Sequence, residues 1–182
     1  VGNAFPFRAL SGWDADPSVW SVETGELVGR STTGLAANSF ARAPLSFADF
    51  RLIVDVRLTP DTANSGIQFR SEALDGGDVG GYQADIGKGW WGILYEEHGR
   101  GVLARPSVEP HRPGEWNTYE ILAVGDRIQL AINGVKTIDF TDPAGRKRGI
   151  LAPQVHSGGP TEVRFRNFRI ELDPQPTLRT LR

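Results

Sequence analysis

The chain of 182 residues contains no cysteine and no methionine. Without cysteine it can form no disulfide bond, no thiolate zinc site and no cysteine nucleophile. No apolar stretch approaches the roughly 20 residues of a membrane-spanning helix, and a net charge of -2 gives no basic field to attract nucleic acid. We therefore expect no nucleic-acid partner and no membrane span, and no segment indicates an obligate protein partner.

The chain opens on Val1 and lacks an initiator methionine. The absence of cysteine fits a protein that folds outside the reducing cytosol. We therefore expect a trimmed or mature exported chain.

Glycine and proline are frequent, with 22 and 12 residues, and both favour short strands joined by turns over long helices. Asn133-Gly134, between two apolar runs, is typical of a type I′ hairpin. Strands are predicted at residues 51–58, 65–70, 81–86, 91–95, 116–123, 127–132, 135–138, 149–156 and 161–172. This regular spacing, with no helix-period segment of ten residues, predicts an all-β sandwich.

The organisation is that of one domain, because the sequence has no internal repeat and no break in composition. We place the domain at residues 5–173. The tail, residues 174–182, contains proline and basic residues, and we expect it to form an extended strap or a frayed end.

Alternation along the strands sorts the side chains into two faces. Where Ile67 and Phe69 face the core, Gln68 and Arg70 share the other face. Two further strands each place a polar pair on the face away from the core: Gln83 with Asp85, and Gln154 with His156. A solvated sheet face is the ordinary explanation for such residues. If the three strands are neighbours, however, they form a polar surface that could bind sugar.

One amide residue and several aromatic and acidic residues near these strands are expected on the rim or walls of that surface: Asn64, Trp90, Trp91, Tyr95, Glu96 and Glu97. Tryptophan stacks well on the apolar face of a sugar ring, but it is also a common core residue. We assign Trp13, Trp20 and Trp116 to the core. Glu96 and Glu97 are adjacent and point to opposite faces of an extended strand, so they are a poor pair for two-carboxylate glycoside hydrolysis.

The ordered set of segments resembles the 3-keto-disaccharide hydrolase family over about residues 8–172. The resemblance is carried mainly by Trp20-Ser-Val-Glu-Thr-Gly-Glu-Leu-Val-Gly29, Asn64-Ser-Gly-Ile-Gln-Phe-Arg70, Gly81-Tyr-Gln-Ala-Asp-Ile86 and Gly149-Ile-Leu-Ala-Pro-Gln-Val-His156. It implies a concanavalin A-like jelly-roll sandwich of two antiparallel sheets. It also implies a bacterial protein that is periplasmic, on the cell surface or secreted, and an oligosaccharide or glycoside ligand oxidised at the sugar C3.

With that substrate, the polar surface becomes a candidate catalytic site. A C3 ketone acidifies the C2 proton, and histidine is the side chain that titrates nearest neutral pH, so His156 is predicted as the base. Arg70 and Gln154 could polarise the ketone. Asp85, Glu96 or Glu97 could be the acid, or could supply oxygen ligands to a divalent cation such as Ca²⁺; no cofactor is certain and no metal ligand is assigned. The predicted substrate-binding residues are Gln68, Gln83, Gln154, Asn64, Trp90, Tyr95 and Glu97.

Two alternatives stay open, because one fold can carry several functions. The domain could bind carbohydrate without cleaving it, as a lectin-like module of a larger exported protein, or it could be a structural or interaction domain. The resembling sequences often carry an acid beside the position of His156, where this chain has Val155, and this departure favours the first alternative.

Overall fold

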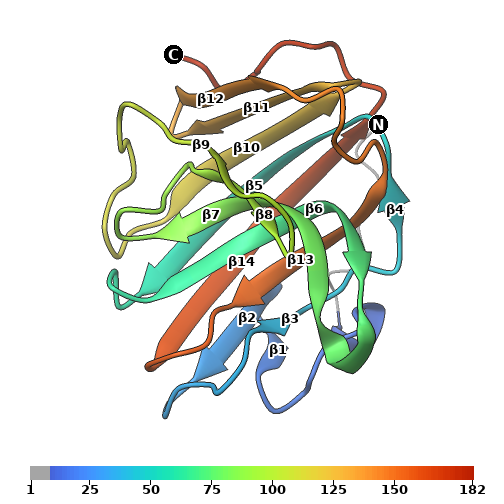
Figure 1. The fold of residues 1–182 in the computed structure, drawn as a ribbon. Helices are drawn as coiled ribbons and strands as arrows, with labels where there is room; N and C mark the ends of the chain where they lie inside the picture. The colour runs from blue at the N-terminus through green and yellow to red at the C-terminus, as the bar shows by residue number, and fades with distance from the viewer. Residues whose placement is uncertain (1–8) are drawn as a thin grey trace.

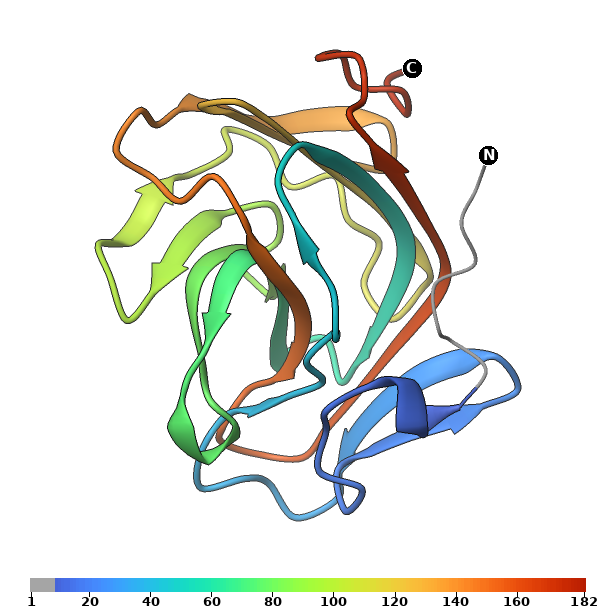
Figure 2. The ribbon, with the colours of Figure 1, turned by 90° about the vertical axis from the view of Figure 1, so that its right-hand side faces the viewer.

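The computed structural model describes residues 9–182, which form two antiparallel sheets packed face to face (Figure 1, Figure 2). The predicted start of the domain at residue 5 lies outside these residues. Helical structure in the described range is limited to two three-residue turns, Leu10–Gly12 and Asp75–Gly77. No helix in residues 9–182 is long and apolar enough to cross a membrane.

The back sheet, behind the other in Figure 1, has seven strands in the order β1-β2-β14-β5-β10-β11-β12. These are β1 Trp20–Glu23, β2 Glu26–Ser31, β14 Thr161–Leu172, β5 Phe50–Thr59, β10 Asn117–Val124, β11 Arg127–Ile132 and β12 Val135–Thr141. The hairpin predicted at Asn133-Gly134 joins β11 to β12, and both residues have the positive φ that a type I′ turn requires.

The front sheet has the order β3-β13-β6-β7-β8-β9, and β4 also pairs with β13. Its strands are β3 Ser39–Phe40, β13 Gly149–Val155, β6 Asn64–Ala73, β7 Val79–Gly87, β8 Leu94–Glu97, β9 Gly101–Ala104 and β4 Ser46–Phe47. The three strands with predicted polar pairs, β13, β6 and β7, are direct neighbours. In both ribbon views β8 and β9 curl over the outer face of this sheet (Figure 1, Figure 2).

The predicted strand at residues 91–95 is shorter than expected. A turn in which the Trp90 and Trp91 N–H groups donate to the Gly87 carbonyl occupies the preceding residues, so β8 begins only at Leu94. The apolar run Trp91–Leu94 is buried, but its first residues belong to this turn.

The core between the sheets confirms the predicted sorting of side chains on β6 and β7. Ile67 and Phe69 are fully buried, and Phe69 stacks on Tyr82 of β7 with ring centroids 5.4 Å apart. Trp13 and Trp20 are buried as predicted. Trp116, the third tryptophan predicted in the core, is only half-buried.

Trp116 lies outside the core, on the outer surface of the back sheet. The Arg166 guanidinium lies 3.8 Å from the centre of its ring, and the Arg57 guanidinium lies 5.1 Å away. These cation–π contacts hold Trp116 against the sheet surface, so its assignment to the core is wrong.

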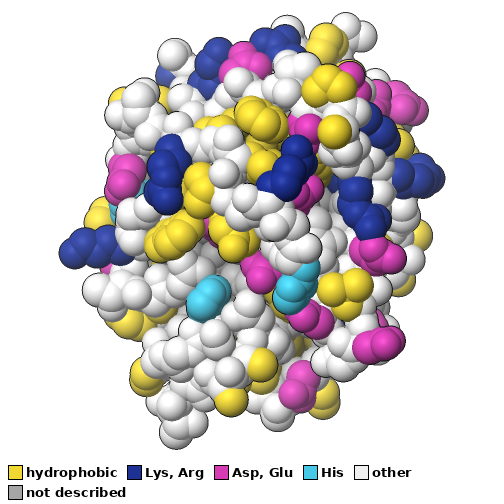
Figure 3. Space-filling view, in the orientation of Figure 1, with side chains coloured by type: hydrophobic (Ala, Val, Ile, Leu, Met, Phe, Trp, Pro, Cys, Tyr) yellow, Lys and Arg dark blue, Asp and Glu magenta, His cyan; other side chains and the backbone are white. Residues whose placement is uncertain are grey.

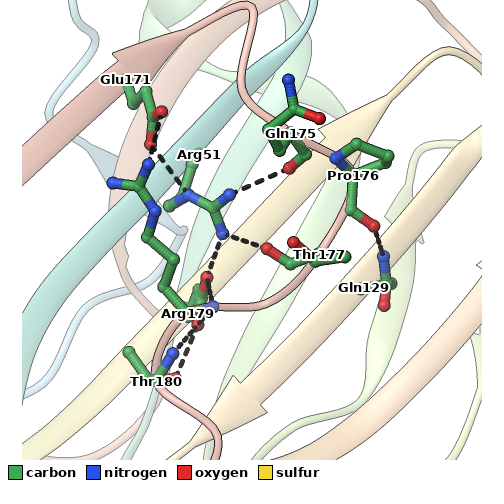
Figure 4. A network of polar contacts seen from close by, with 9 residues as sticks. Arg51, Gln129, Glu171, Gln175, Pro176, Thr177, Arg179 and Thr180 are labelled. Carbon is green, nitrogen blue, oxygen red and sulfur yellow. Dashed lines mark hydrogen bonds and ion pairs between the residues drawn. The ribbon is translucent and has the colours of Figure 1, made fainter.

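The tail, residues 174–182, forms a strap across the outer face of the back sheet (Figure 4). The buried Arg51 guanidinium donates to Glu120 (2.5 Å) and to the carbonyls of Gln175 and Thr177. Glu120 accepts the backbone N–H groups of Arg179 and Thr180. Of the two expected forms of the tail, the structure therefore shows the strap.

Candidate functional site

The outer face of the front sheet holds a hollow with a volume of about 130 Å³. Histidine and acidic side chains gather near the middle of this face (Figure 3). The hollow is lined by Asn64, Gln83, Asp85, Trp90, Tyr95, Glu97 and His156. All seven were predicted site residues, and the fold brings them together from β6, β7, β8 and the end of β13.

The backbone around β7 explains how the floor of the hollow forms. Gln83 and Asp85 face outward because Tyr82 and Ala84 face the core. Gly66 of β6 pairs with Asp85, and a Cβ at Gly66 would lie 2.5 Å from Cδ of Gln83. Glycine at this position therefore leaves the space in which the Gln83 amide lies.

Asp85 is the most perturbed carboxyl group at the site. The residue is only 3% exposed, and burial raises the pKa of Asp85 to about 7, against an opposing hydrogen bond from Gln83; the Glu97 charge raises it further and Arg105 lowers it. The Gln83 amide donates to Oδ1 at 2.5 Å. The carboxyl group is therefore partly protonated near neutral pH and can give or take a proton there.

His156 is held in a defined tautomer by the backbone. Its Nδ1 lies 2.7 Å from the carbonyl oxygen of Ser157. A carbonyl only accepts hydrogen bonds, so Nδ1 carries the proton and the lone pair of the neutral ring is on Nε2. The backbone N–H of His156 donates to the carbonyl of Asn64, which ties the histidine to the start of β6. The ring thus offers a basic nitrogen at the hollow.

Two residues of β8 complete the polar wall. Burial raises the pKa of Glu97. Burial, together with the charges of Glu97 and Asp85, also raises the pKa of Tyr95. The Tyr95 hydroxyl therefore keeps its proton at neutral pH and can donate it to a ligand.

Trp90 forms the rim. It is 37% exposed and meets Tyr95 edge to face, with centroids 6.4 Å apart. The Arg105 guanidinium lies 5.7 Å from the centre of the Trp90 ring. Sequence reasoning missed Arg105, which follows β9 in a loop with no motif to mark it.

Arg70 does not belong to the site, and this prediction is wrong. A β-bulge shifts the pairing of β6 and β7 between Phe69 and Glu72, and Arg70 itself has a φ of 45°. Its buried guanidinium donates to the carbonyls of Ala48 and Gly125 and to Asp49, at 2.7–2.9 Å. These contacts tie loops together at the end of the sandwich, so Arg70 is a structural residue.

Glu96 was predicted as a site residue, but it does not line the hollow. On β8 it faces away from Tyr95 and Glu97, and it is paired with Arg100, which also binds Asp142. Hydrogen bonding to Arg100 lowers the pKa of Glu96, so this carboxylate is ionised and engaged away from the hollow.

Three further predicted residues are too deep to touch a ligand. Gln68 and Gln154 are fully buried beneath the hollow, where both contact Gln83. Trp91 is buried against His111, with ring centroids 5.1 Å apart. The prediction that Gln68 and Gln154 bind substrate directly is therefore corrected, because these side chains lie under Gln83.

The predicted divalent cation finds no ready ligand set. Within residues 9–182, no three His, Asp or Glu side chains converge closely enough to hold a metal ion. Asp85, Glu97 and His156 share the hollow without forming such a cluster.

The architecture is a jelly-roll β-sandwich of the concanavalin A type, and solved structures share it. A proposed glycosyl hydrolase from Parabacteroides distasonis is 18% identical, with a TM-score of 0.68 and 91% of both chains covered. The carbohydrate-binding module CBM66 from Bacillus subtilis is 20% identical, with a TM-score of 0.66 and coverage of 88% of this chain and 95% of the module. A family GH16 endo-β-1,3(4)-glucanase is 15% identical, with a TM-score of 0.61 and coverage of 85% and 74%.

The family is narrower than the fold. The family model of the 3-keto-alpha-glucoside-1,2-lyase-like domain matches residues 4–171, and the chain belongs to this family of carbohydrate-active β-sandwich domains. No curated protein matches the chain. The match confirms the resemblance seen in the sequence.

Proposed function

We propose that the domain cleaves the C1–O bond of glycosides that carry a ketone at C3 of the sugar. The ketone acidifies the hydrogen on C2, and a base removes it as a proton to give an enolate. The enolate electrons form the C1–C2 double bond as the C1–O bond breaks. The leaving oxygen takes a proton and departs as an alcohol, and water added across the double bond returns the free keto-sugar.

His156 and Asp85 have complementary properties for the two proton transfers. The neutral imidazole, with its lone pair on Nε2, suits removal of the C2 proton. The Asp85 carboxyl, with a pKa near 7, suits delivery of a proton to the leaving oxygen. Two titratable groups whose surroundings give them different roles are the usual arrangement for acid–base catalysis near neutral pH.

The remaining lining residues fit the charge and shape of the substrate. The enolate oxygen needs hydrogen-bond donors, and the Asn64 amide and the Tyr95 hydroxyl both line the hollow. The hollow, with a volume of about 130 Å³, has room for the reacting edge of one sugar ring. The rest of the glycoside would then pass the exposed Trp90.

The observation that carries the proposal is a buried carboxyl group with a near-neutral pKa in the same hollow as a histidine with a free Nε2. The departure at Val155 does not weaken it. Val155 is buried in the core on the opposite face of β13, so an acid at that position of this backbone would not face the hollow. Asp85 of β7 supplies the carboxyl group instead.

The test is incubation with a C3-oxidised glucoside, followed by analysis of the released alcohol and keto-sugar. We expect wild-type turnover and its loss in both Asp85→Asn and His156→Gln, while neither variant unfolds at a lower temperature than the wild type at pH 5. The matched control is His98→Gln, because His98 is exposed, contacts Asp78 and lies outside the hollow. Full turnover in either site variant, or none in the wild type, contradicts the proposal.

Binding without cleavage is the second candidate. The exposed Trp90 beside Tyr95 is a suitable platform for a sugar ring, and a carbohydrate-binding module shares the fold. Calorimetric titration with the same oxidised glucoside separates the two functions. Saturable binding with no product, weakened in Trp90→Ala, supports the binding module.

A further inference from the structure

A chain of buried amides leads from the interior of the front sheet to Asp85. The Ser71 hydroxyl donates to Oε1 of Gln68 at 2.7 Å. Nε2 of Gln68 donates to Oε1 of Gln83 at 2.9 Å, and Nε2 of Gln83 donates to Oδ1 of Asp85 at 2.5 Å. Each of these four residues is 3% exposed or less, and of the four, Gln83 and Asp85 line the hollow.

The neighbours of Gln83 select one orientation of its amide. Besides Asp85, the Gln83 Nε2 group also faces Oε1 of Gln154, at 3.4 Å. With Asp85 ionised and Gln68 and Gln154 oriented as in the structure, reversing the amide would place its oxygen against two oxygen acceptors and its NH₂ group against the NH₂ group of Gln68. Because buried polar groups require matched partners, the ionised form of Asp85 favours this orientation, and Gln68 supports it from behind. The oxygen of Gln68 is the nearest of three acceptors around the Ser71 hydroxyl, the others being the carbonyls of Phe69 and Tyr82.

The consequence appears at the two oxygens of Asp85. Oδ1 accepts the Gln83 amide in the ionised form, and it can keep doing so in the acid form only if the proton is on the other oxygen. Oδ2 has no hydrogen-bond donor among residues 9–182, and Asp85 lines the hollow. The proton is thus directed to the oxygen that is free to meet a ligand.

We propose that Gln68 and Ser71 are positioning residues that act through Gln83 to keep the exchangeable proton of Asp85 on Oδ2, where it can be transferred to the substrate. This inference rests on the proposed function for its catalytic meaning, but not for its structural test. Gln68 was predicted to contact the ligand. Here it instead orients Gln83, which contacts Asp85.

Other titratable and charged groups also face Asp85, and they affect the pKa of Asp85 in the wild type and in every variant. Glu97 and Tyr95 approach from β8, Arg105 from the loop after β9, and His156 from the end of β13. From β10, the Tyr119 hydroxyl donates to the backbone carbonyl of Asp85 at 3.1 Å. None of these groups contacts Gln68 or Ser71 through a hydrogen bond, so changing the chain of amides leaves them in place.

The test is an NMR titration of the Asp85 carboxyl carbon, which needs no substrate. In Gln68→Met the Gln83 amide loses its fixed orientation, and the carboxylate loses a hydrogen bond that favours the charged form. We expect the midpoint to rise by about one pH unit, the equivalent of one hydrogen bond to a charged group. The matched control is Gln129→Met, because Gln129 is buried on β11 and donates to the Pro176 carbonyl of the strap; its midpoint should equal that of the wild type.

Ser71→Ala should move the Asp85 midpoint in the same direction by a smaller amount, and it carries the test if Gln68→Met does not fold. An unchanged midpoint in the folded variants overturns the proposal. With an active wild type, Gln68→Met should lower kcat about tenfold and leave KM within twofold, because Gln68 does not reach the ligand. A shifted midpoint in a protein that never cleaves the keto-glucoside leaves the positioning role standing and refutes only the proposed function.

Discussion

Replacing Asp85 by asparagine should make the domain more stable at pH 8 and leave its stability unchanged at pH 3. The structure buries this carboxyl group with a single amide donor on Oδ1 and no cationic hydrogen-bond partner. The native state therefore holds the proton more tightly than the unfolded chain does. Asparagine has nearly the same shape, keeps an oxygen for the Gln83 amide and carries no charge at any pH.

The sign and size of the effect follow from the two pKa values. Burial raises the pKa of Asp85 from 3.8 to about 7. Between these values the native state binds more protons than the unfolded state, so the free energy of unfolding falls as pH rises, and it is level above about pH 7. A difference of about 3 pH units at about 1.4 kcal/mol each gives a cost of about 4 kcal/mol at pH 8.

The assay is urea unfolding of the wild type and of Asp85→Asn from pH 3 to pH 8. For a domain of this size, about 4 kcal/mol corresponds to about 10 °C in thermal unfolding. Asp139→Asn is a control of opposite sign. The hydrogen bond from Arg127 lowers the pKa of Asp139, so this exposed variant should lose up to about 1 kcal/mol at pH 8.

Parallel stability curves for the wild type and Asp85→Asn over this range would refute the reasoning. So would a variant that is less stable than the wild type at pH 8. Either result means that Asp85 is ionised in the native state with partners that the structure does not show, and the acid role proposed for it would fall with the stability prediction.

Three further predictions concern the strap, the rim and the floor of the hollow. Glu120→Gln should lower the free energy of unfolding by about 3–5 kcal/mol in urea titrations, because it leaves the Arg51 charge buried without its closest counter-ion; a loss below 1 kcal/mol contradicts this. Trp90→Ala should weaken glycoside binding about tenfold by calorimetry, through lost ring stacking, with little change in melting temperature. Gly66→Ala should displace the Gln83 amide, 2.5 Å from the added Cβ, and reduce turnover while the protein stays folded; an unaltered rate counts against the placement of Gln83.

The polar face of the front sheet could be predicted from sequence because alternation holds along most of β7 and β13. Gln83 and Asp85 flank a core alanine, and Gln154 and His156 flank Val155. A period of two is imposed by the backbone of a strand and needs no knowledge of its partners. The candidate hollow lies where that period is unbroken.

The same rule failed at Arg70 and could not choose between Glu96 and Glu97. A bulge adds a residue without a sequence signal of its own, and every later side chain then changes face. Arg70 lies within such a bulge of β6. On β8, four residues long, alternation separates the two glutamates but does not say which one faces the hollow.

Alternation along a strand also could not predict how deeply an outward-facing side chain is buried. Gln68 and Gln154 lie on the predicted face, yet both are fully buried beneath it. Whether an outward side chain reaches solvent depends on the segments that cover it, which come from distant parts of the sequence. For this reason the hydrogen bonds from Gln68 through Gln83 to Asp85 could not be predicted from the sequence.

Two buried carboxyl groups in this domain show why Asp85 is the one to associate with chemistry. Burial alone would raise the pKa of Glu120, but hydrogen bonds from Thr180, Arg179 and Arg51 outweigh it and the pKa falls. Both of its oxygens are occupied, so Glu120 holds the strap and has nothing left to offer a ligand. Asp85 is equally buried but has one donor and one free oxygen, and its charged form destabilises the native state. An arrangement with that cost serves no purpose in holding the sandwich together, and it is what a group needs if it is to take and release a proton at neutral pH.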